Sequence, residues 1–270
     1  MDTRITKPVQ HILDHYLALF LQKLPETFVG LYIHGSIAFD AYQEGSSDID
    51  FMAVVNKPLG DEEVQAISHI HQELKRKHTI EMDGSYVLKN EVGRNSDHIS
   101  DCLYVNGGNT MRSKHEMNPV TWWMLKNKGI RVTGPDISSF SIKVEESELT
   151  TFILQNMNRY WAGRINTLKK YKRVAVFLPN RFIEKELLWT VPGVLRQFYT
   201  LQERAVTSKI KACTYACDHV PERWHPLINE VISLREGRRT GYAKSKKQKI
   251  DDLLQFMVNI IAYCNEKYSA

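Results

Sequence analysis

Residues 34–50 decide the fold, and they read His34-Gly-Ser-Ile-Ala-Phe-Asp-Ala-Tyr-Gln-Glu-Gly-Ser-Ser-Asp48-Ile-Asp50. Alternate side chains of a β-strand share a face, so we expect Asp48 and Asp50 to point the same way, with Cα atoms about 7 Å apart. That spacing can ligate one hard cation or bracket two. The apolar residues 51–55 that follow predict a strand anchored in a core, with two carboxylates at its start.

The residues before this strand predict a tight turn that can bind phosphate. Residues 28–34 form a short apolar stretch typical of a buried strand. Gly35 permits a sharp strand-to-helix turn, and Ser36 is suited to cap a short helix that runs through Tyr42. Backbone N–H groups at such a helix start can bind phosphate oxygens, so we expect Gly35 and Ser36 to bind nucleotide.

A third carboxylate is expected on a neighbouring strand. Residues 79–89 predict a strand that contains Ile80-Glu-Met-Asp-Gly-Ser-Tyr-Val-Leu88, in which Glu81 and Asp83 share one face. Either carboxylate could complete a metal site or take a proton from an acceptor hydroxyl. We favour Asp83, because Gly84 after it leaves space for a substrate, and keep Glu81 as the alternative.

Hydrophobic periodicity divides the chain into two parts. In the first part it predicts helices at 7–24, 61–77 and 119–128, with the strands already named and a further strand near 101–105. After Gly134-Pro135 few strand signals remain, and helical periodicity covers 146–171, 183–201, 208–217, 223–235 and 249–267. The expected fold is therefore α+β, with a small mixed sheet in an N-terminal domain at 1–145 and an all-helical C-terminal domain at 146–270.

Composition excludes several classes of protein. The 270 residues are 43% hydrophobic, yet no apolar run approaches the roughly 20 residues that a membrane span needs. The N-terminus shows no signal-peptide pattern, and we expect a cytoplasmic protein without a membrane partner. The four cysteines do not form paired clusters of metal-ligand spacing.

The net charge of +5 is unevenly distributed. Residues 1–150 hold 15 Lys and Arg against 21 Asp and Glu, whereas residues 151–270 hold 21 against 10. An acidic half that binds metal and a basic half that faces phosphates suit one active site. The densest basic cluster, at 235–249, contains a single aromatic residue, Tyr242, so a solvated loop is favoured over a nucleic-acid surface.

Together these residues predict metal-dependent nucleotidyl transfer. Such an enzyme holds a triphosphate, neutralises charge on its α-phosphate and deprotonates an acceptor hydroxyl. Two Mg²⁺ ions do most of this, and each needs only a few carboxylates besides phosphates and water. We expect Asp48 and Asp50 to be the metal ligands and ATP to be the co-substrate.

The motif from His34-Gly35-Ser36 to Asp48-Ile49-Asp50 resembles the signature of the polymerase β-like nucleotidyltransferases. Within that superfamily the whole chain resembles the aminoglycoside adenylyltransferases of the streptomycin/spectinomycin type. The resemblance extends through residues 129–135 (Gly-Ile-Arg-Val-Thr-Gly-Pro) and into the helices, at 194–201 (Val-Leu-Arg-Gln-Phe-Tyr-Thr-Leu) and 207–209 (Thr-Ser-Lys).

The resemblance implies specific roles. Asp83 falls where the family has its catalytic glutamate, Arg196 and Lys209 fall on positions that approach the ATP phosphates, and Glu186 falls near an acid that contacts the drug. The chain departs from the family twice: its third carboxylate is one methylene shorter, and acids on the acceptor side are sparse. A binding site for a polycationic drug needs several carboxylates, so the second departure leaves the identity of the acceptor undecided.

Three functions remain open at this stage. The first is transfer of AMP to a hydroxyl of an aminoglycoside-like small molecule, of the streptomycin or spectinomycin type. The second is adenylylation of a protein, a tRNA or another metabolite, with the basic helical half as docking surface. The third is a nucleotide-binding module without turnover, which the retained acids disfavour.

Overall fold

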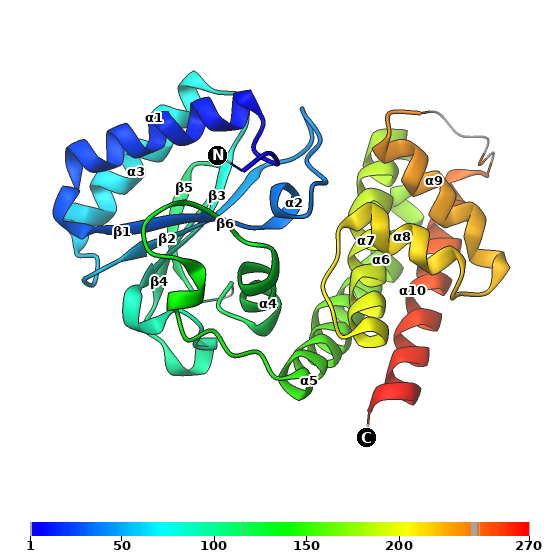
Figure 1. Cartoon of the computed structure of the whole chain (residues 1–270). Coiled ribbons are helices and arrows are strands. Elements are labelled where there is room, and N and C mark those ends of the chain that lie inside the picture. Colours follow the sequence, from blue (N-terminus) through cyan, green and yellow to red (C-terminus); the bar gives the residue numbers. More distant parts are fainter. Residues whose placement is uncertain (1, 115, 239–241, 243, 270) are drawn as a thin grey trace. The chain divides into compact units, whose positions relative to one another are not determined.

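The computed structural model describes residues 2–114, 116–238, 242 and 244–269, so the basic cluster at 235–249 is described only in part. The chain forms two compact units, Met1–Val144 and Glu145–Ala270. Each unit has its own set of helices or strands (Figure 1).

The described part of the N-terminal unit contains a six-stranded mixed sheet in the order β5-β4-β3-β2-β1-β6. Its central pair, β2 and β3, is parallel, and the other neighbouring pairs are antiparallel. Parallel neighbours need a crossover connection, which here is the helix α3 (Asp61–Lys77). The strands are β1 (Phe28–Ile33), β2 (Ile49–Val55), β3 (Met82–Leu88), β4 (Cys102–Asn106), β5 (Asn109–Ser113) and β6 (Ile130–Thr133).

Helices cover both faces of this sheet (Figure 1). On one face lie α1 (Lys7–Lys23) and α3 (Asp61–Lys77), which pack against Phe51, Ala53 and Val55 of β2. On the other face α4 (Pro119–Lys128) places Trp122 against Met52 and Val54. The alternation along β2 therefore sends its even-numbered residues toward the α4 face, and Asp50 shares that face.

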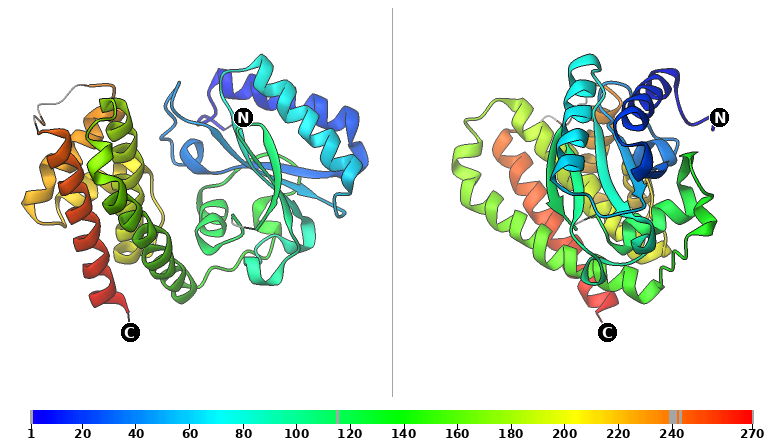
Figure 2. Two further views of the ribbon diagram at one scale, coloured as in Figure 1. Left: turned by 180° about the vertical axis from the view of Figure 1, so that it is seen from behind. Right: turned by 90° about the vertical axis from the view of Figure 1, so that its left-hand side faces the viewer.

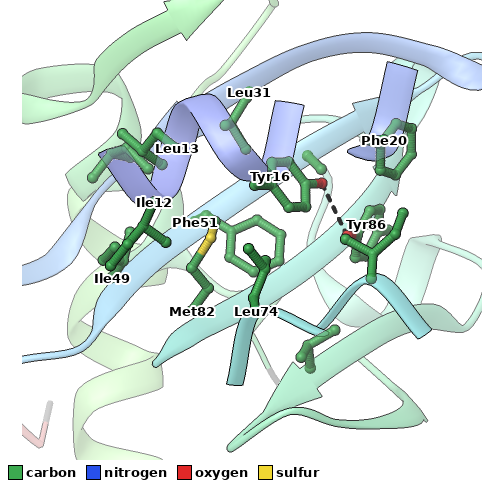
Figure 3. Close-up of a cluster of buried hydrophobic side chains, with 14 of the residues drawn as sticks. Ile12, Leu13, Tyr16, Phe20, Leu31, Ile49, Phe51, Leu74, Met82 and Tyr86 are labelled. Carbon is green, nitrogen blue, oxygen red and sulfur yellow. Dashed lines mark hydrogen bonds between the residues drawn. The ribbon is translucent and has the colours of Figure 1, made fainter. Parts of the chain in front are cut away.

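The core beneath α1 and α3 is aromatic and includes buried polar contacts. Tyr16 and Tyr86 are joined by a hydrogen bond of 2.9 Å between their hydroxyls, drawn as a dashed line in Figure 3. Phe51 packs beside them with its ring centroid 5.8 Å from that of Tyr16. Burying each such large side chain contributes about 1.5–3 kcal/mol, which anchors β2 and β3 firmly.

The turn after β1 differs from the expected one. The helix α2 spans only Gly35–Ala38, with His34 as its N-cap. Ser36 therefore lies inside this single turn, and the prediction that it caps a helix through Tyr42 was wrong. The chain leaves the helix at Phe39 and takes a positive φ of 53° at Asp40, which ends the helix four residues early.

Two edge strands, β5 and β6, were not predicted from the sequence. The strand β5 pairs only with β4 and exposes most of its side chains, so its residues do not alternate in hydrophobicity. Gly107 and Gly108, both with positive φ, form the hairpin turn that joins the two strands. The strand β6 has only four residues and borders β1 at the other edge of the sheet.

The described part of the C-terminal unit is helical, as two further views show (Figure 2). The single helix expected at 146–171 contains a π-helical turn at Met157–Trp161, so that α5 and α6 flank this turn. None of the described helices is both long and apolar enough to cross a membrane. The helices are α5 (Glu146–Asn156), α6 (Ala162–Ala175), α7 (Asn180–Glu203), α8 (Lys209–Cys217), α9 (His225–Arg235) and α10 (Lys246–Tyr268).

Candidate active site

The structure sets Asp50 directly opposite Asp83. In the parallel pairing of β2 with β3, Asp50 is the register partner of Asp83, and neighbouring strands lie about 4.8 Å apart. A hydrogen bond of 2.8 Å from the Ile49 N–H to the Glu81 carbonyl fixes this register at the start of both strands. Two carboxylates from separate strands thus stand side by side on the α4 face of the sheet.

Gly35 brings the backbone of the turn against the Asp50 carboxylate. It has φ +62°, and a Cβ built on it would lie 1.7 Å from Asp50 Oδ2. The neighbouring His34 N–H donates to the Asp50 carbonyl at 3.0 Å. Only glycine fits this backbone conformation and this close approach, which explains physically why the motif carries Gly35.

Ser36 follows with a hydroxyl that can accept a ligand. Its Oγ is buried and makes no hydrogen bond within the described part of the chain. A buried polar atom without a partner costs about 1–3 kcal/mol, and a phosphate oxygen would remove that cost. This is consistent with the expected role of Ser36 in binding nucleotide. The helix α2 has only four residues, however, so its dipole contributes little to binding a phosphate.

Asp83 is held from the β4–β5 turn. The Gly107 N–H donates to Asp83 Oδ1 at 2.8 Å, and Asn106 Nδ2 donates to Oδ2 at 3.4 Å. Burial raises the pKa of Asp83, the Gly107 hydrogen bond opposes this, and the charges of Asp48 and Glu81 raise it further. A carboxylate with a raised pKa is a better proton acceptor than an ordinary aspartate.

Glu81 occupies a different environment. It precedes β3, its side chain is 45% exposed, and it pairs with Lys75 at 3.4 Å. This ion pair directs its carboxylate toward α3 and the β4–β5 turn, where Gly107 also lies. The geometry therefore favours Asp83 over Glu81 as the group beside Asp50.

One acid that sequence reasoning missed joins this cluster. Glu116, just before α4, accepts a hydrogen bond of 2.7 Å from Ser85 Oγ, two residues beyond Asp83 on the same face of β3. Burial raises the pKa of Glu116, while His34 and the Ser85 hydrogen bond lower it. The ring of His34 is only 3% exposed, and burial lowers its pKa against the opposing charge of Glu116. No spacing signal marks Glu116, because it lies in a loop far from the motif in sequence.

The acids are arranged as in a magnesium site and not as in a site where three or more protein side chains surround the ion. Among the described residues, no three His, Cys, Asp or Glu side chains converge to hold an ion. Mg²⁺ does not need such a cage, since it keeps several waters and binds one or two carboxylates together with substrate phosphates. Asp50 at the start of β2 and the exposed Asp48 two residues before it offer that donor set.

In the helical unit, Glu186 and Arg196 lie on α7, and Lys209 is the first residue of α8. Glu186 on α7 pairs with Arg164 on α6 and accepts a hydrogen bond of 2.6 Å from Thr190 Oγ1. Arg196 Nε donates to the Thr207 carbonyl at 3.0 Å, and the Lys209 ammonium lies 5.8 Å from the ring centroid of Trp189. Glu186 is therefore already neutralised by a cation of its own unit.

Part of the sequence, and the fold as a whole, resemble known proteins. Residues 183–260 match the family model for the aminoglycoside adenylyltransferase C-terminal domain. Among solved structures, the chain is similar to the spectinomycin adenyltransferase AAD(9) from Enterococcus faecialis, solved with ATP and spectinomycin. The TM-score is 0.67 at 13% identity, over 94% of this chain and 99% of that one. No curated protein sequence gives a significant match.

An identity of 13% establishes the fold alone, and at that level the expected α+β class, with a mixed sheet and C-terminal helices, is confirmed. The resemblance noted in the sequence is confirmed as well. Residues 183–260 therefore match the family model of the aminoglycoside adenylyltransferase C-terminal domain, and the chain that carries them has the fold of the spectinomycin adenyltransferase AAD(9).

Proposed function

We propose that this protein transfers AMP from Mg·ATP to a hydroxyl of an aminoglycoside-like small molecule, of the streptomycin or spectinomycin type. The observation that carries the proposal is the register of β2 and β3, which sets Asp50 opposite Asp83 beside the Gly35 turn. The family of residues 183–260 supports an aminoglycoside as acceptor. Because ATP is the co-substrate, we expect the protein to act in the cytoplasm.

Each residue of the N-terminal unit has a role in this reaction. Asp48 and Asp50 hold magnesium, which we expect as two ions and which supplies charge neutralisation at the transferring phosphate. Gly35 and Ser36 bind the triphosphate through backbone N–H and hydroxyl groups. Asp83 takes the proton of the acceptor hydroxyl, whose oxygen then attacks the α-phosphate. A phosphoester to AMP forms, the bond to the β-phosphate breaks, and pyrophosphate leaves.

Two cationic side chains of the helical unit, Arg196 and Lys209, are our candidates for binding the triphosphate of ATP. Arg196 is held by the Thr207 carbonyl, and Lys209 begins α8 directly after that loop. We propose that both neutralise negative charge on the triphosphate, as cations do in phosphoryl-transfer enzymes. Substituting Lys209 by Ala should then raise the KM for ATP more than the KM for the acceptor.

The surroundings of Glu186 point to the charge of the acceptor. Arg164 already pairs with this carboxylate, so little negative charge remains to attract a polycation. Trp189 and Tyr160 lie nearby with 52% and 46% of their surface exposed, joined by a hydrogen bond of 3.1 Å. We propose that Glu186 and these rings bind an acceptor of modest charge, which favours spectinomycin over streptomycin.

The experiment is a pyrophosphate-release assay with ATP and magnesium, screened against spectinomycin, streptomycin and kanamycin-type drugs. We expect release with at least one of the first two. The Asp48→Asn variant should lose release by about 100- to 1,000-fold, as removal of transition-state charge stabilisation typically does, and Asp14→Asn, at an exposed position on α1, should retain it. Label from ATP that ends on protein or tRNA instead would favour the macromolecular acceptor, and full activity of Asp48→Asn would contradict the metal assignment.

A further inference from the structure

The acidic cluster on the α4 face of the sheet contains one carboxylate, that of Glu116, to which the proposed reaction gives no task. It accepts a hydrogen bond of 2.7 Å from Ser85 Oγ. Ser85 and Asp83 are alternate residues of β3, so their side chains share a face and their Cα atoms lie about 7 Å apart. Glu116 therefore lies beside the proposed base, one step further along the same strand.

Glu116 does not complete the proposed magnesium site. Among the described residues, no three His, Cys, Asp or Glu side chains are placed to hold one ion, so Glu116 does not converge on a metal with Asp50 and Asp83. Burial raises the pKa of Glu116, and the negative charges of Asp50 and Asp83 raise it further, so the three carboxylates are close enough to repel one another. The site thus holds more negative charge than its proposed metal ligands account for.

Among the described residues, little positive charge balances Glu116. Of the basic groups, His34 has the largest effect on the pKa of Glu116. The ring of His34 is buried, and this burial lowers its own pKa, so the imidazole is neutral at pH 7 and does not balance the carboxylate. Natural proteins keep such unfavourable groups chiefly at functional sites, which points to a ligand that brings a positive charge.

We propose that Glu116 determines acceptor specificity, by binding an ammonium group on the carbon next to the hydroxyl that Asp83 deprotonates. The acceptor is then a vicinal amino alcohol, held at its two neighbouring polar groups by two neighbouring carboxylates. This inference rests on the proposed adenylyl transfer and assigns to that reaction a residue that it did not yet use.

The separation of the two carboxylates fits such a unit. Hydrogen bonds to a carboxylate are about 2.6 Å long from a hydroxyl and about 2.8 Å from an ammonium, and the oxygen and nitrogen of a gauche vicinal amino alcohol are about 3 Å apart. A bent chain of these three segments spans about 7 Å, which is the rise of two strand residues. A carboxylate accepts several hydrogen bonds, so Glu116 can bind the ammonium while it accepts from Ser85.

An aromatic ring borders the same place. Tyr104 on β4 is the register partner of Ser85, so the two side chains share a face. Burial raises the pKa of Tyr104, and the charges of Glu116 and Asp83 raise it further. Asn106 Nδ2 lies 3.2 Å from the Tyr104 hydroxyl and 3.4 Å from Asp83 Oδ2, which holds the ring next to the proposed base. A ring in this position adds cation–π attraction for a bound ammonium.

Steady-state kinetics of the full chain with Mg·ATP test the proposal. The acceptors are the drug that the wild-type protein adenylylates and an analogue with a neutral hydroxyl in place of the amine next to the modified position. Glu116→Gln can still accept from Ser85 but loses the charge. It should raise the KM for the drug by about tenfold or more, as loss of a charged hydrogen bond does, and should change the KM for the analogue and for ATP less than threefold.

The matched control is Glu91→Gln. Glu91 is also buried and accepts a hydrogen bond, of 3.0 Å from the Ser100 N–H, but it lies beyond the other end of β3. This variant should leave all three KM values unchanged. Thermal melting of both variants shows whether they are folded.

Nuclear magnetic resonance of the product provides a second readout, because it identifies the adenylylated hydroxyl, which we expect next to an amine. If no drug accepts AMP, the proposed function fails and this inference fails with it. If a drug is modified, the inference alone is overturned by modification of a hydroxyl without a neighbouring amine. It is also overturned if folded Glu116→Gln leaves the KM for the drug unchanged or raises the KM for drug and analogue equally.

Discussion

At the scale of single residues, Gly35 shows how the motif builds the site. It combines a positive φ with a close approach to the Asp50 carboxylate, and only glycine meets both requirements together. Gly45 shares only one of them, since it has φ +78° but faces open space. The two glycines therefore separate backbone strain from steric contact.

This contrast leads to a prediction. Gly45→Ala should cost about 1–2 kcal/mol of unfolding free energy, the usual penalty for an L-residue in the left-handed region. Gly35→Ala should cost more than that and should abolish transfer, because the new methyl group must displace the Asp50 carboxylate. Urea unfolding and the release assay measure both effects, and equal behaviour of the two variants would refute the close-approach argument.

The choice between the two acids of the third strand is also testable. Asp83→Asn should lower kcat by about 100-fold or more, as loss of a general base typically does, whereas Glu81→Gln should change kcat less than threefold because Glu81 pairs with Lys75 at the surface. The measurement is kcat at saturating ATP and acceptor. The reverse pattern would assign the base to Glu81.

The raised pKa of Glu116 predicts how the stability of the protein depends on pH. Burial raises the pKa of its carboxyl from the usual 4.5, so in the pH range just above 4.5 the folded protein retains a proton that the unfolded chain has released. Stability therefore falls as the pH rises through the folded-state pKa. Glu116→Gln, which can still accept from Ser85, removes this penalty. In metal-free buffer the variant should be more stable than the wild type at pH 7, with a gain that disappears below about pH 4.5.

The same residues mark the limit of prediction from sequence. The shared face of Asp50 and Asp83 was predictable because a period of two on apolar strands fixes it, whereas Asp48, expected on the same strand as Asp50, lies just before β2. The preference for Asp83 over Glu81 gains support from the pairing register, from the hydrogen bond of Gly107 and from the ion pair between Glu81 and Lys75, which only the structure shows. Glu116 and its contact with Ser85 depend on how a distant loop folds back, which no local pattern encodes.

At the scale of elements, the long helices were predictable, whereas an edge strand and a local irregularity within a helix were not. The helix expected at 119–128 is α4, with the same bounds, capped by the Asn118 side chain and closed at Gly129. The edge strand β5 was missed because most of its side chains are exposed, so its sequence lacks the alternation of buried and exposed residues that marks a strand. The π-helical turn at Met157–Trp161 was missed because its residues show ordinary helical periodicity.

This π-helical turn packs against a glycine of α7. A Cβ on Gly193 would lie 2.4 Å from Cζ2 of Trp161, whose ring is 4% exposed. Gly193→Ala should therefore cost about 1–3 kcal/mol by overpacking. Gly163→Ala on α6, where a Cβ meets nothing within 4 Å, should instead stabilise by up to about 1 kcal/mol. Chemical unfolding of the two variants compares them directly, and a stable Gly193→Ala would show that the turn can rearrange.

At the scale of the whole molecule, composition and motif together limit the chemistry. The first 150 residues carry the acids of the site and an excess of acidic side chains, and the remainder carries an excess of basic ones. We propose that the N-terminal unit binds magnesium and a triphosphate, and residues 183–260 of the helical unit match the family model of the aminoglycoside adenylyltransferase C-terminal domain. Our proposal for the acceptor depends on Glu186 and Arg164, whose pairing only the structure reveals.

The most direct test of the central claim is mass spectrometry of spectinomycin and streptomycin after incubation with the protein, ATP and magnesium. We predict that one drug, spectinomycin first, gains the mass of one adenylyl group, that an equal amount of pyrophosphate appears, and that Asp50→Asn forms no such product. Drugs that remain unmodified while the wild-type protein binds Mg·ATP, or a drug that gains a phosphoryl group instead, would contradict the proposed reaction.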